Sequence, residues 1–383
     1  MEINNNLVDK KSSLKELITY FLKLGTVGFG GPIALTASMN EDLVVKRNWF
    51  TERAFSEGMT LSQLAPGPLA AQLAIYFGWA HSGIRGATLV GLAFILPSFL
   101  IVILISLLYV KFGSLPWLAK AFYGIGASVI AIILLGTWKL SQKTLKKDKL
   151  LWVIASINAI VTAYTGAEIL WVFLLSGLVV MAYRMKLYKS KIIPIIFPTW
   201  FFIGASSSPA SHDTLTTILL FFLKAGAFVF GSGLAIVPFL HGGVVTEFQW
   251  LTEKQFLDAV AVAMITPGPV VITVAFIGFL VAGLGGAILA ALGTFIPCYL
   301  FTIIPAPHFS KWAKNSYVHE FVTGVTTAAV GAIGGAAFVL GKGAIIDSAT
   351  AAICIISFMA IHRIKLAEPI VILAVGILSV LMT

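Results

Sequence analysis

The chain has 383 residues, of which 58% are hydrophobic and 11% are charged, a balance that excludes an ordinary soluble globule and is typical of a membrane protein. Its net charge of +10 comes largely from lysines and arginines near or between apolar segments, which favours membrane topology over nucleic-acid binding. The two cysteines, Cys298 and Cys354, lie far apart and indicate neither a disulfide framework nor a zinc site.

The first apolar segment is interrupted at "GTVGFGGPIAL", Gly25 to Leu35, and an amphipathic stretch with Thr51 as the expected helix N-cap follows it. A second interruption, "APGP", spans Ala65 to Pro68. Beyond it, Leu89 to Val110 carries no charge over about the 20 positions that a helix needs to cross a bilayer. We expect about four full crossings after the second interruption in each half.

The second half of the chain repeats the first at a spacing near 200 residues. "FLKLGTVGFGGPIA" from Phe21 returns as "FLKAGAFVFGSGLA" from Phe222, and "WFTERAF" from Trp49 returns as "WLTEKQF" from Trp250. "APGP" returns as "TPGP" from Thr266. This shared register indicates a tandem duplication. The predicted division is a first repeat at 1–190, a connecting segment at 191–213 that supplies one extra crossing, and a second repeat at 214–383.

Loop charges predict that the two repeats face opposite ways, because lysine and arginine are retained on the cytoplasmic side. Five lysines crowd residues 139–149, and the next loop of that repeat has no basic residue, whereas the second repeat has the reverse order, with Arg363 and Lys365 in the later loop. Basic residues also flank both ends of the Gly25 segment, so this segment is expected to enter and leave on the cytoplasmic side, together with the N-terminus. The predicted fold class is an all-α polytopic membrane protein of two homologous inverted repeats with re-entrant or broken helices, an architecture used by transporters.

The interruptions predict an anion site near the membrane midplane, between the repeats. A broken helix survives in hydrocarbon only where protein, water or a ligand satisfies its N–H and C=O groups, and a helix N-terminus attracts anions. Gln72 adds a side-chain donor, and Lys23 and Lys224 are ionisable at membrane depth. The alternatives are close helix packing for the glycines and snorkelling for the lysines. The candidate substrate-binding residues are Gly28, Phe29, Gly30, Gly31, Pro32, Pro66, Gly67, Pro68, Gln72, Gly231, Ser232, Gly233, Pro267, Gly268, Pro269, Lys23 and Lys224.

Four further residues are weaker candidates for a gate or a cytoplasmic vestibule. Arg47 and Arg85 could attract anions, or could be ordinary positive-inside residues. Asn40 and His241 occupy equivalent positions at the end of the first segment of each repeat, where a satisfied polar contact is the alternative reading.

The stretches "FGGP", "RNWFTERAF" and "LSQLAPGPLAAQLAIYFG" resemble the chromate ion transporter family, and the second half carries the same pattern as "FGSG", "QWLTEKQF" and "MITPGP". The resemblance covers nearly the whole chain. It implies a bacterial inner-membrane exporter of chromate, a sulfate analogue, driven by membrane potential or ion exchange and not by ATP. Its motif positions here are Phe29, Gly30, Gly31, Pro32, Arg47, Trp49, Pro66, Gly67, Pro68 and Gln72. The second repeat departs from them at Ser232, Gly233, Phe248 and Thr273, so the halves are not expected to act identically.

Of the function classes, the sequence favours a secondary transporter for a tetrahedral dianion. A dianion leaving a cell that is negative inside gains roughly 4.6 kcal/mol at 100 mV, so export needs no coupling proton. An anion channel and an uptake transporter for sulfate or another oxyanion remain alternatives. No nucleotide, CxxC or HExxH motif indicates an enzyme, a cofactor or a metal. The expected partners are the oxyanion, chromate or sulfate, and the lipid bilayer, without nucleic acid; a homodimer is left open.

Overall fold

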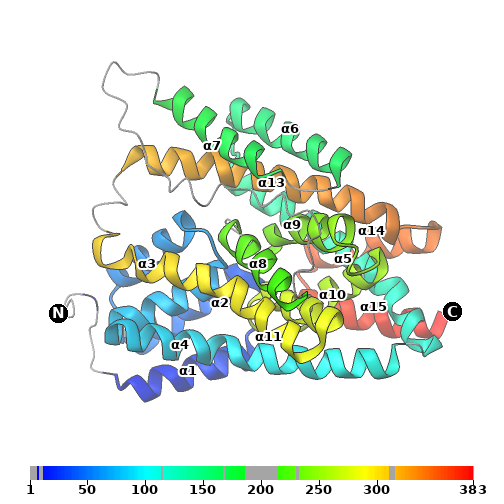
Figure 1. Cartoon of the computed structure of the whole chain (residues 1–383), viewed down its shortest axis with the longest axis horizontal. Coiled ribbons are helices and arrows are strands. Elements are labelled where there is room, and N and C mark those ends of the chain that lie inside the picture. Colours follow the sequence, from blue (N-terminus) through cyan, green and yellow to red (C-terminus); the bar gives the residue numbers. More distant parts are fainter. Residues whose placement is uncertain are drawn as a thin grey trace.

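The computed structural model describes residue 7 and residues 12–113, 115–166, 169–185, 214–229, 233–309 and 315–382. These residues form helices joined by turns and loops, without a β-strand (Figure 1). The helices of the first repeat are α1 (Leu14–Val27), α2 (Gly31–Met39), η1 (Asn40–Lys46), α3 (Glu52–Leu64), α4 (Leu69–Phe112), α5 (Pro116–Thr144), α6 (Lys149–Thr165) and α7 (Leu170–Arg184). Those of the second repeat are α8 (Thr214–Ala227), η3 (Gly233–Ala235), α9 (Ile236–His241), η4 (Gly242–Glu247), α10 (Glu253–Ile265), η5 (Val270–Ile272), α11 (Thr273–Ile303), η6 (Ala306–His308), α13 (Ser316–Ala344), α14 (Ser348–His362) and α15 (Glu368–Met382).

Four helical stretches are long and apolar enough to cross a membrane: α4, α5, the stretch 270–308 that contains α11, and α13. The last two helices of each repeat are apolar but shorter, at 15 to 17 residues. Four helices therefore follow the second interruption of each repeat, two of full length and two shorter than the about 20 residues of a typical crossing. The extra crossing predicted within 191–213 lies outside the described residues.

Each interruption lies in a helical hairpin. The hydroxyl of Tyr20 on α1 donates to Asp42 on η1 at 3.3 Å, so the chain returns alongside α1. The hydroxyl of Tyr76 on α4 donates to Glu57 on α3 at 3.3 Å, so the first part of α4 runs back along α3. Because these contacts bring the two arms of each hairpin together, the prediction of re-entrant or broken helices is confirmed.

The long helices α4 and α11 each contain a sharp turn that the sequence analysis did not predict. Ser82 and Ala282 leave the helical region at φ −144°, and Gly83 and Gly283 follow at φ +61° and +60°. At both turns the chain folds back on itself. In the first repeat, for example, the backbone at Gly78 packs against the backbone at Gly86. The second hairpin of each repeat therefore ends at this turn, and the crossing helix begins after it.

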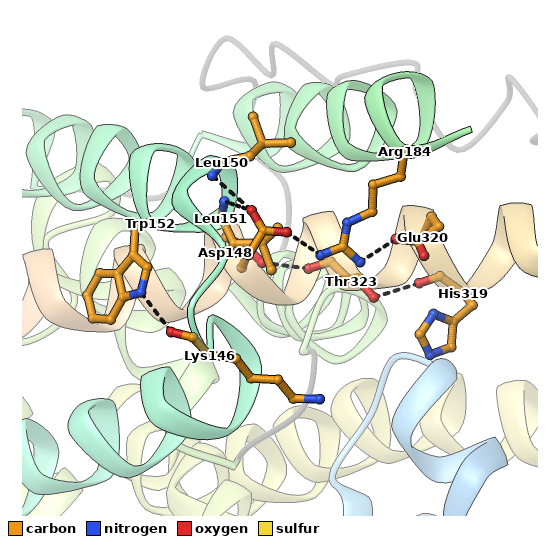
Figure 2. Close-up of polar contacts among 10 residues, drawn as sticks. Lys146, Asp148, Leu150, Leu151, Trp152, Arg184, His319, Glu320 and Thr323 are labelled. Carbon is orange, nitrogen blue, oxygen red and sulfur yellow. Dashed lines mark hydrogen bonds and ion pairs between the residues drawn. The ribbon is translucent and has the colours of Figure 1, made fainter. Parts of the chain in front are cut away.

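The inversion of the repeats is visible in how α5 and its counterpart α13 pack. Tyr123, near the start of α5, donates to Asp347, just after the end of α13. At the other end, Arg184 of α7 bridges two acidic residues (Figure 2). It forms ion pairs with Asp148, which follows α5, at 2.6 Å and with Glu320, near the start of α13, at 2.7 Å. The two equivalent helices thus run antiparallel. Helices α6 and α7 of the first repeat pack against α13, and α14 and α15 of the second pack against α5, so the repeats exchange partners.

The helix ends outside the interruptions carry local stop and start signals. Thr51 and Thr252 accept hydrogen bonds from backbone N–H groups in the first turns of α3 and α10, which confirms Thr51 as an N-cap. Ser13, Asp148 and Asp347 cap α1, α6 and α14 in the same way. Side-chain caps of this kind satisfy N–H groups that have no partner within the helix.

Candidate functional site

The four interruptions of the helices are called breaks here: 28–32 and 65–68 in the first repeat, 228–233 and 266–269 in the second. Glycine is needed in them, because Gly30, Gly67 and Gly268 have φ values of +101°, +142° and +92°, in a region that L side chains rarely adopt. Gly31 follows at +71°. The glycines in these breaks therefore set the backbone path.

Two hydrogen bonds tie the breaks of opposite repeats together. The backbone N–H of Gly67 donates to the carbonyl of Val229 at 2.6 Å, and the N–H of Gly268 donates to the carbonyl of Gly28 at 2.8 Å. Val229 occupies the position in the second repeat that Gly28 occupies in the first. The same bond is thus made twice, once in each direction across the junction of the halves.

A further contact joins the two pairs. Gly233 lies against Val270 and Val271, which begin the helix after the 266–269 break. All four breaks therefore meet at the junction of the repeats, where the sequence placed the candidate site. Gly231 and Ser232, also candidates, lie outside the described residues.

Side chains from the crossing helices lie against the hairpin breaks of the opposite repeat. Ser98 on α4 lies against Gly268, and Cys298, its counterpart on α11, lies against Gly67. The Ser98 hydroxyl also donates to the carbonyl of Gly25 on α1 at 3.2 Å. Each residue directly follows a proline, Pro97 or Pro297, so the duplicated proline marks the depth of the breaks.

Gln72 is buried, and its amide is committed to its own loop. Nε2 donates to the carbonyl of Pro66 at 2.8 Å, while Oε1 is buried without a hydrogen-bond partner among the described residues. Its counterpart Thr273 donates to Val270 at 3.0 Å. In this structure the amide that the sequence assigns to an oxyanion therefore donates within the 65–68 break. Pro66 and Pro68 lie in that break, and Pro267 and Pro269 lie in the 266–269 break.

Three of the helices that resume after the breaks, α2, α4 and η5, begin without side-chain caps, unlike α1, α3 and α10. Gly30 before α2, Pro68 before α4 and Pro269 before η5 provide no capping side chain. The first N–H groups of such helices have no acceptor within the helix, and the helix dipole makes this end positive. Pro32 at the start of α2 lacks an N–H, as suits a first turn. Chemically, the arrangement can bind an anion through backbone N–H groups without reacting with it.

The two repeats differ in the exposure of the side chains near their first breaks. Phe29 and Ile33 beside the first break are 46% and 67% exposed. In the second repeat α9 is largely buried, and His241 holds it: Nδ1 contacts the carbonyl of Gly166 at 3.0 Å and Nε2 contacts Glu253 at 2.9 Å. Asn40, the counterpart of His241, has a buried Oδ1 without a partner among the described residues. Phe29 and Ile33 of the first repeat are therefore exposed, whereas α9 of the second repeat is held in place by His241.

Lys23 and Arg47 lie together at one pocket of about 270 Å³ beside the first hairpin. Arg47 sits over the rings of Tyr20 and Trp49 at 5.4 and 4.7 Å. We call this site the cationic pocket. Its full lining is Lys15, Glu16, Thr19, Tyr20, Lys23 and Arg47.

The second repeat has aromatic rings where the first has the cationic pocket. Phe248 replaces Arg47 and stacks on Trp250 at 4.5 Å, with Phe221 packed against both. Lys224, the counterpart of Lys23, lies 6.0 Å from the ring of Phe239. Arg85 is exposed just beyond the Gly83 turn and does not line the cationic pocket. Positive charge therefore gathers beside the first repeat's hairpin.

The sequence analysis missed one buried carboxylate near the breaks. Asp258 on α10 is 3% exposed and accepts a hydrogen bond from Tyr109 of the opposite repeat at 2.7 Å. Its counterpart is Glu57, and each lies nine residues before the first proline of its repeat's "PGP". That recurrence is the signal that could have identified it. Among the described residues, no group of three histidine, cysteine or acidic side chains could hold a metal ion.

Comparison with known proteins identifies the family. The family model described as "Chromate transporter" matches residues 15–181 and again 216–380. The chain is 50% identical over 382 residues to the "Chromate transport protein" of Cupriavidus metallidurans, covering 96% of this chain and 92% of that protein. It is 51% identical to the "Probable chromate transport protein" of Synechococcus elongatus (96% and 95% covered) and 30% identical to the "Chromate transport protein" of Pseudomonas aeruginosa (84% and 80% covered).

No solved structure matches the chain. The two matches to the family model fall on the two repeats, and the curated relatives extend over nearly the whole chain. These findings confirm the resemblance seen in the motifs and the membrane character seen in the composition. The chain belongs to the chromate transporter family and is a multi-pass membrane transport protein built from two inverted repeats.

Proposed function

We propose that the protein exports a tetrahedral oxyanion, chromate before sulfate, across a bacterial inner membrane, with its N-terminus in the cytoplasm. The observation that carries the proposal is the mutual pairing of the breaks, Gly67 to Val229 and Gly268 to Gly28. It gathers uncapped helix N-termini at the junction of the halves, where backbone N–H groups attract an anion. The anion is bound near the midplane by the residues of the four breaks.

The cationic pocket supports a cytoplasmic entry path. Positive charge is concentrated beside the hairpin that contains the 28–32 break, on Lys15, Lys23 and Arg47. Phe29 and Ile33 of this hairpin are exposed. Basic residues are retained on the cytoplasmic side of membrane proteins, so this face is assigned to the cytoplasm. An anion drawn to this side and released on the other runs down the membrane potential, which supplies about 2.3 kcal/mol per charge at 100 mV.

Driving by membrane potential or by ion exchange is part of the proposal, and uptake of sulfate or another oxyanion is the alternative direction. A channel is the second alternative, because an open path lined by N–H groups would conduct the same ions. The burial of α9, set against the exposure of Phe29 and Ile33 in the first repeat, supports a transporter, which keeps one side closed while the other is open. Saturable flux and exchange separate a transporter from a channel, which gives single-channel currents.

The test is flux of labelled chromate and sulfate into or out of proteoliposomes under an imposed potential of either sign. The informative variant is Gly31→Ala, with Gly83→Ala as its matched control. Both glycines have positive φ, +71° and +61°, and an added Cβ meets nothing within 4 Å at either position. An alanine is strained at both positions, and only Gly31 lies in a break. Lower flux in Gly31→Ala alone supports the proposal; equal flux in all three proteins contradicts the assignment of the site, and no flux of either anion contradicts the substrate.

A further inference from the structure

Asp258 is a carboxylate buried inside the helix bundle with one hydrogen-bond donor from another element. The Tyr109 hydroxyl donates to its Oδ2 at 2.7 Å from the far end of α4. Tyr109 is itself enclosed by Phe122 and Phe276, whose rings meet it edge-on at 5.8 and 5.2 Å. An ionised carboxylate in such a position is costly, so an acidic residue there is a functional candidate by default.

The equivalent carboxylate of the first repeat has a different environment. Glu57 is partly exposed and forms an ion pair with Arg53 at 2.9 Å, one helical turn earlier. Lys254 replaces Arg53 in the second repeat, but its side chain is exposed and forms no ion pair with Asp258 within 4 Å. Duplication thus left one acid neutralised at the surface and one enclosed without a close cation.

Two titratable groups favour the ionised form of the Asp258 carboxyl group: Tyr109, which donates to it from α4, and Lys254, which precedes it on α10. Other titratable side chains lie on the described helices packed against α10. They are Tyr76, His81, Arg85 and Lys111 on α4, Lys120, Tyr123, Lys139 and Lys143 on α5, Glu247 on η4, Cys298 and Tyr299 on α11, Tyr317, His319, Glu320 and Lys342 on α13, and Glu368 on α15.

Asp258 is connected directly to a break. Helix α10 runs from Asp258 to Ile265 and ends at Thr266, the first residue of the 266–269 break. At a rise of 1.5 Å per residue, the carboxylate lies about 12 Å along the helix from that break. Over this distance in a poorly polarisable interior, one carboxylate charge changes the affinity for a dianion by roughly tenfold or more.

We propose that Asp258 is a proton-binding site that couples protonation of the carboxyl group to anion binding at the breaks. The inference rests on the proposed function, because it concerns the same anion site. A protonated, neutral Asp258 no longer repels the dianion. By thermodynamic reciprocity, a bound dianion then favours proton uptake by the same factor. Tyr109 holds the carboxylate in place and stabilises its ionised form.

The experiment measures proton uptake when sodium sulfate or sodium chromate is added to the weakly buffered, detergent-solubilised protein. Wild type takes up as much as one proton per bound anion, and its anion affinity falls by as much as about tenfold per pH unit where Asp258 titrates. Asp258→Asn binds the anion with little dependence on pH. Because chromate itself gains a proton in mildly acid solution, the difference between the two proteins is the readout; sulfate stays doubly charged.

Two further variants make the result specific. Glu57→Gln, the matched change in the first repeat, keeps the wild-type proton uptake. Tyr109→Phe keeps the carboxyl group and removes the donor that stabilises its charge, so the pH dependence moves to higher pH; this readout stands even if Asp258→Asn folds poorly. Anion binding with equal proton uptake in wild type and Asp258→Asn overturns the inference and leaves the proposed function intact. Absence of anion binding in wild type overturns both.

Discussion

Ser98 of the first repeat lies directly against Gly268 of the second, and a Cβ added to Gly268 would overlap its hydroxyl oxygen. The serine follows Pro97 on a crossing helix, and the glycine is the tip of the opposite hairpin, where its N–H donates to Gly28. The two repeats therefore pack closely against each other at this contact, at the depth of the breaks. The contact gives a direct test of that packing.

We predict that Gly268→Ala destabilises the protein by about 1–3 kcal/mol, because the methyl group overlaps Ser98 and the φ of +92° is unfavourable for alanine. Adding Ser98→Ala removes the overlapping oxygen and recovers on the order of 1 kcal/mol. Thermal unfolding of the four proteins of this cycle in detergent measures the coupling. Gly283→Ala is the control: its φ is +60° and nothing lies within 4 Å of the added atom. A loss for Gly268→Ala that is the same with and without Ser98→Ala would show that Ser98 does not matter.

Much of this architecture is predictable from the sequence, because it depends on helix-interrupting glycines and prolines that recur in both repeats. The breaks recur at matched positions, so the hairpins follow from residues such as Gly30 and Gly67, and the inversion follows from the reversed order of loop charges, with lysines at 139–149 and Arg363 and Lys365 in the later loop of the second repeat. The turns at Gly83 and Gly283 were missed because a lone glycine in an apolar run more often serves helix packing. Their recurrence at a spacing of 200 was the available signal.

The pairing of the breaks could not be predicted at the level of bonds. Gly67 donates to Val229, which has no special residue type, because only the folded backbone brings that carbonyl to the hairpin tip. The side-chain type of Gln72 predicts an anion ligand, whereas the bond from its amide to the carbonyl of Pro66 depends on the folded loop and could not be predicted. Asp258 escaped attention because an acidic residue in an amphipathic stretch normally faces water; the burial comes from Tyr109, 149 residues away in the chain.

A second prediction concerns the cationic pocket. Lys23→Gln and Arg47→Gln should each raise the KM for the anion several-fold at low salt with little change in kcat, because they weaken the attraction of the anion to the pocket. The difference should shrink in about 0.5 M salt, where charges are screened over a few Å. Lys224→Gln is the matched control, since Lys224 is the counterpart of Lys23 but borders Phe239 and an aromatic cluster. An effect of Lys224→Gln equal to that of Lys23→Gln would contradict a role specific to the cationic pocket.

A third prediction concerns His241, which holds α9 of the second repeat in place. His241→Asn places there the residue found at the equivalent position, Asn40, and removes the contacts with Gly166 and Glu253. Hydrogen exchange should become faster across 233–247, because the segment loses its attachment to α6, while exchange across 31–46 stays unchanged. Asn40→His provides the reciprocal variant. Unchanged exchange across 233–247 would show that packing alone, without His241, holds α9 in place.

The last prediction concerns Asp148, which lies in the loop before α6, outside the membrane-spanning segments, where Arg184 joins it to Glu320 (Figure 2). The hydrogen bond from Arg184 lowers the pKa of the Asp148 carboxyl, helped by the N–H groups of Leu150 and Leu151, although partial burial opposes the shift. A carboxyl whose pKa is lower in the folded state than in the unfolded state stabilises the protein above the unfolded pKa of about 3.9. That contribution is lost as the pH falls through the folded-state value.

Asp148→Asn should therefore unfold at a lower temperature than wild type near pH 6, by an amount on the order of 1 kcal/mol, since the pair is partly exposed. The difference should narrow as the pH is lowered from 6 to 3, because wild type then loses the charge that the variant never had. Arg184→Met should reproduce the loss at pH 6, since it removes the partner of both Asp148 and Glu320. Thermal unfolding across this pH range measures the effect, and a difference between wild type and Asp148→Asn that does not change with pH would show that the ionised carboxylate contributes nothing to the contact between α6, α7 and α13.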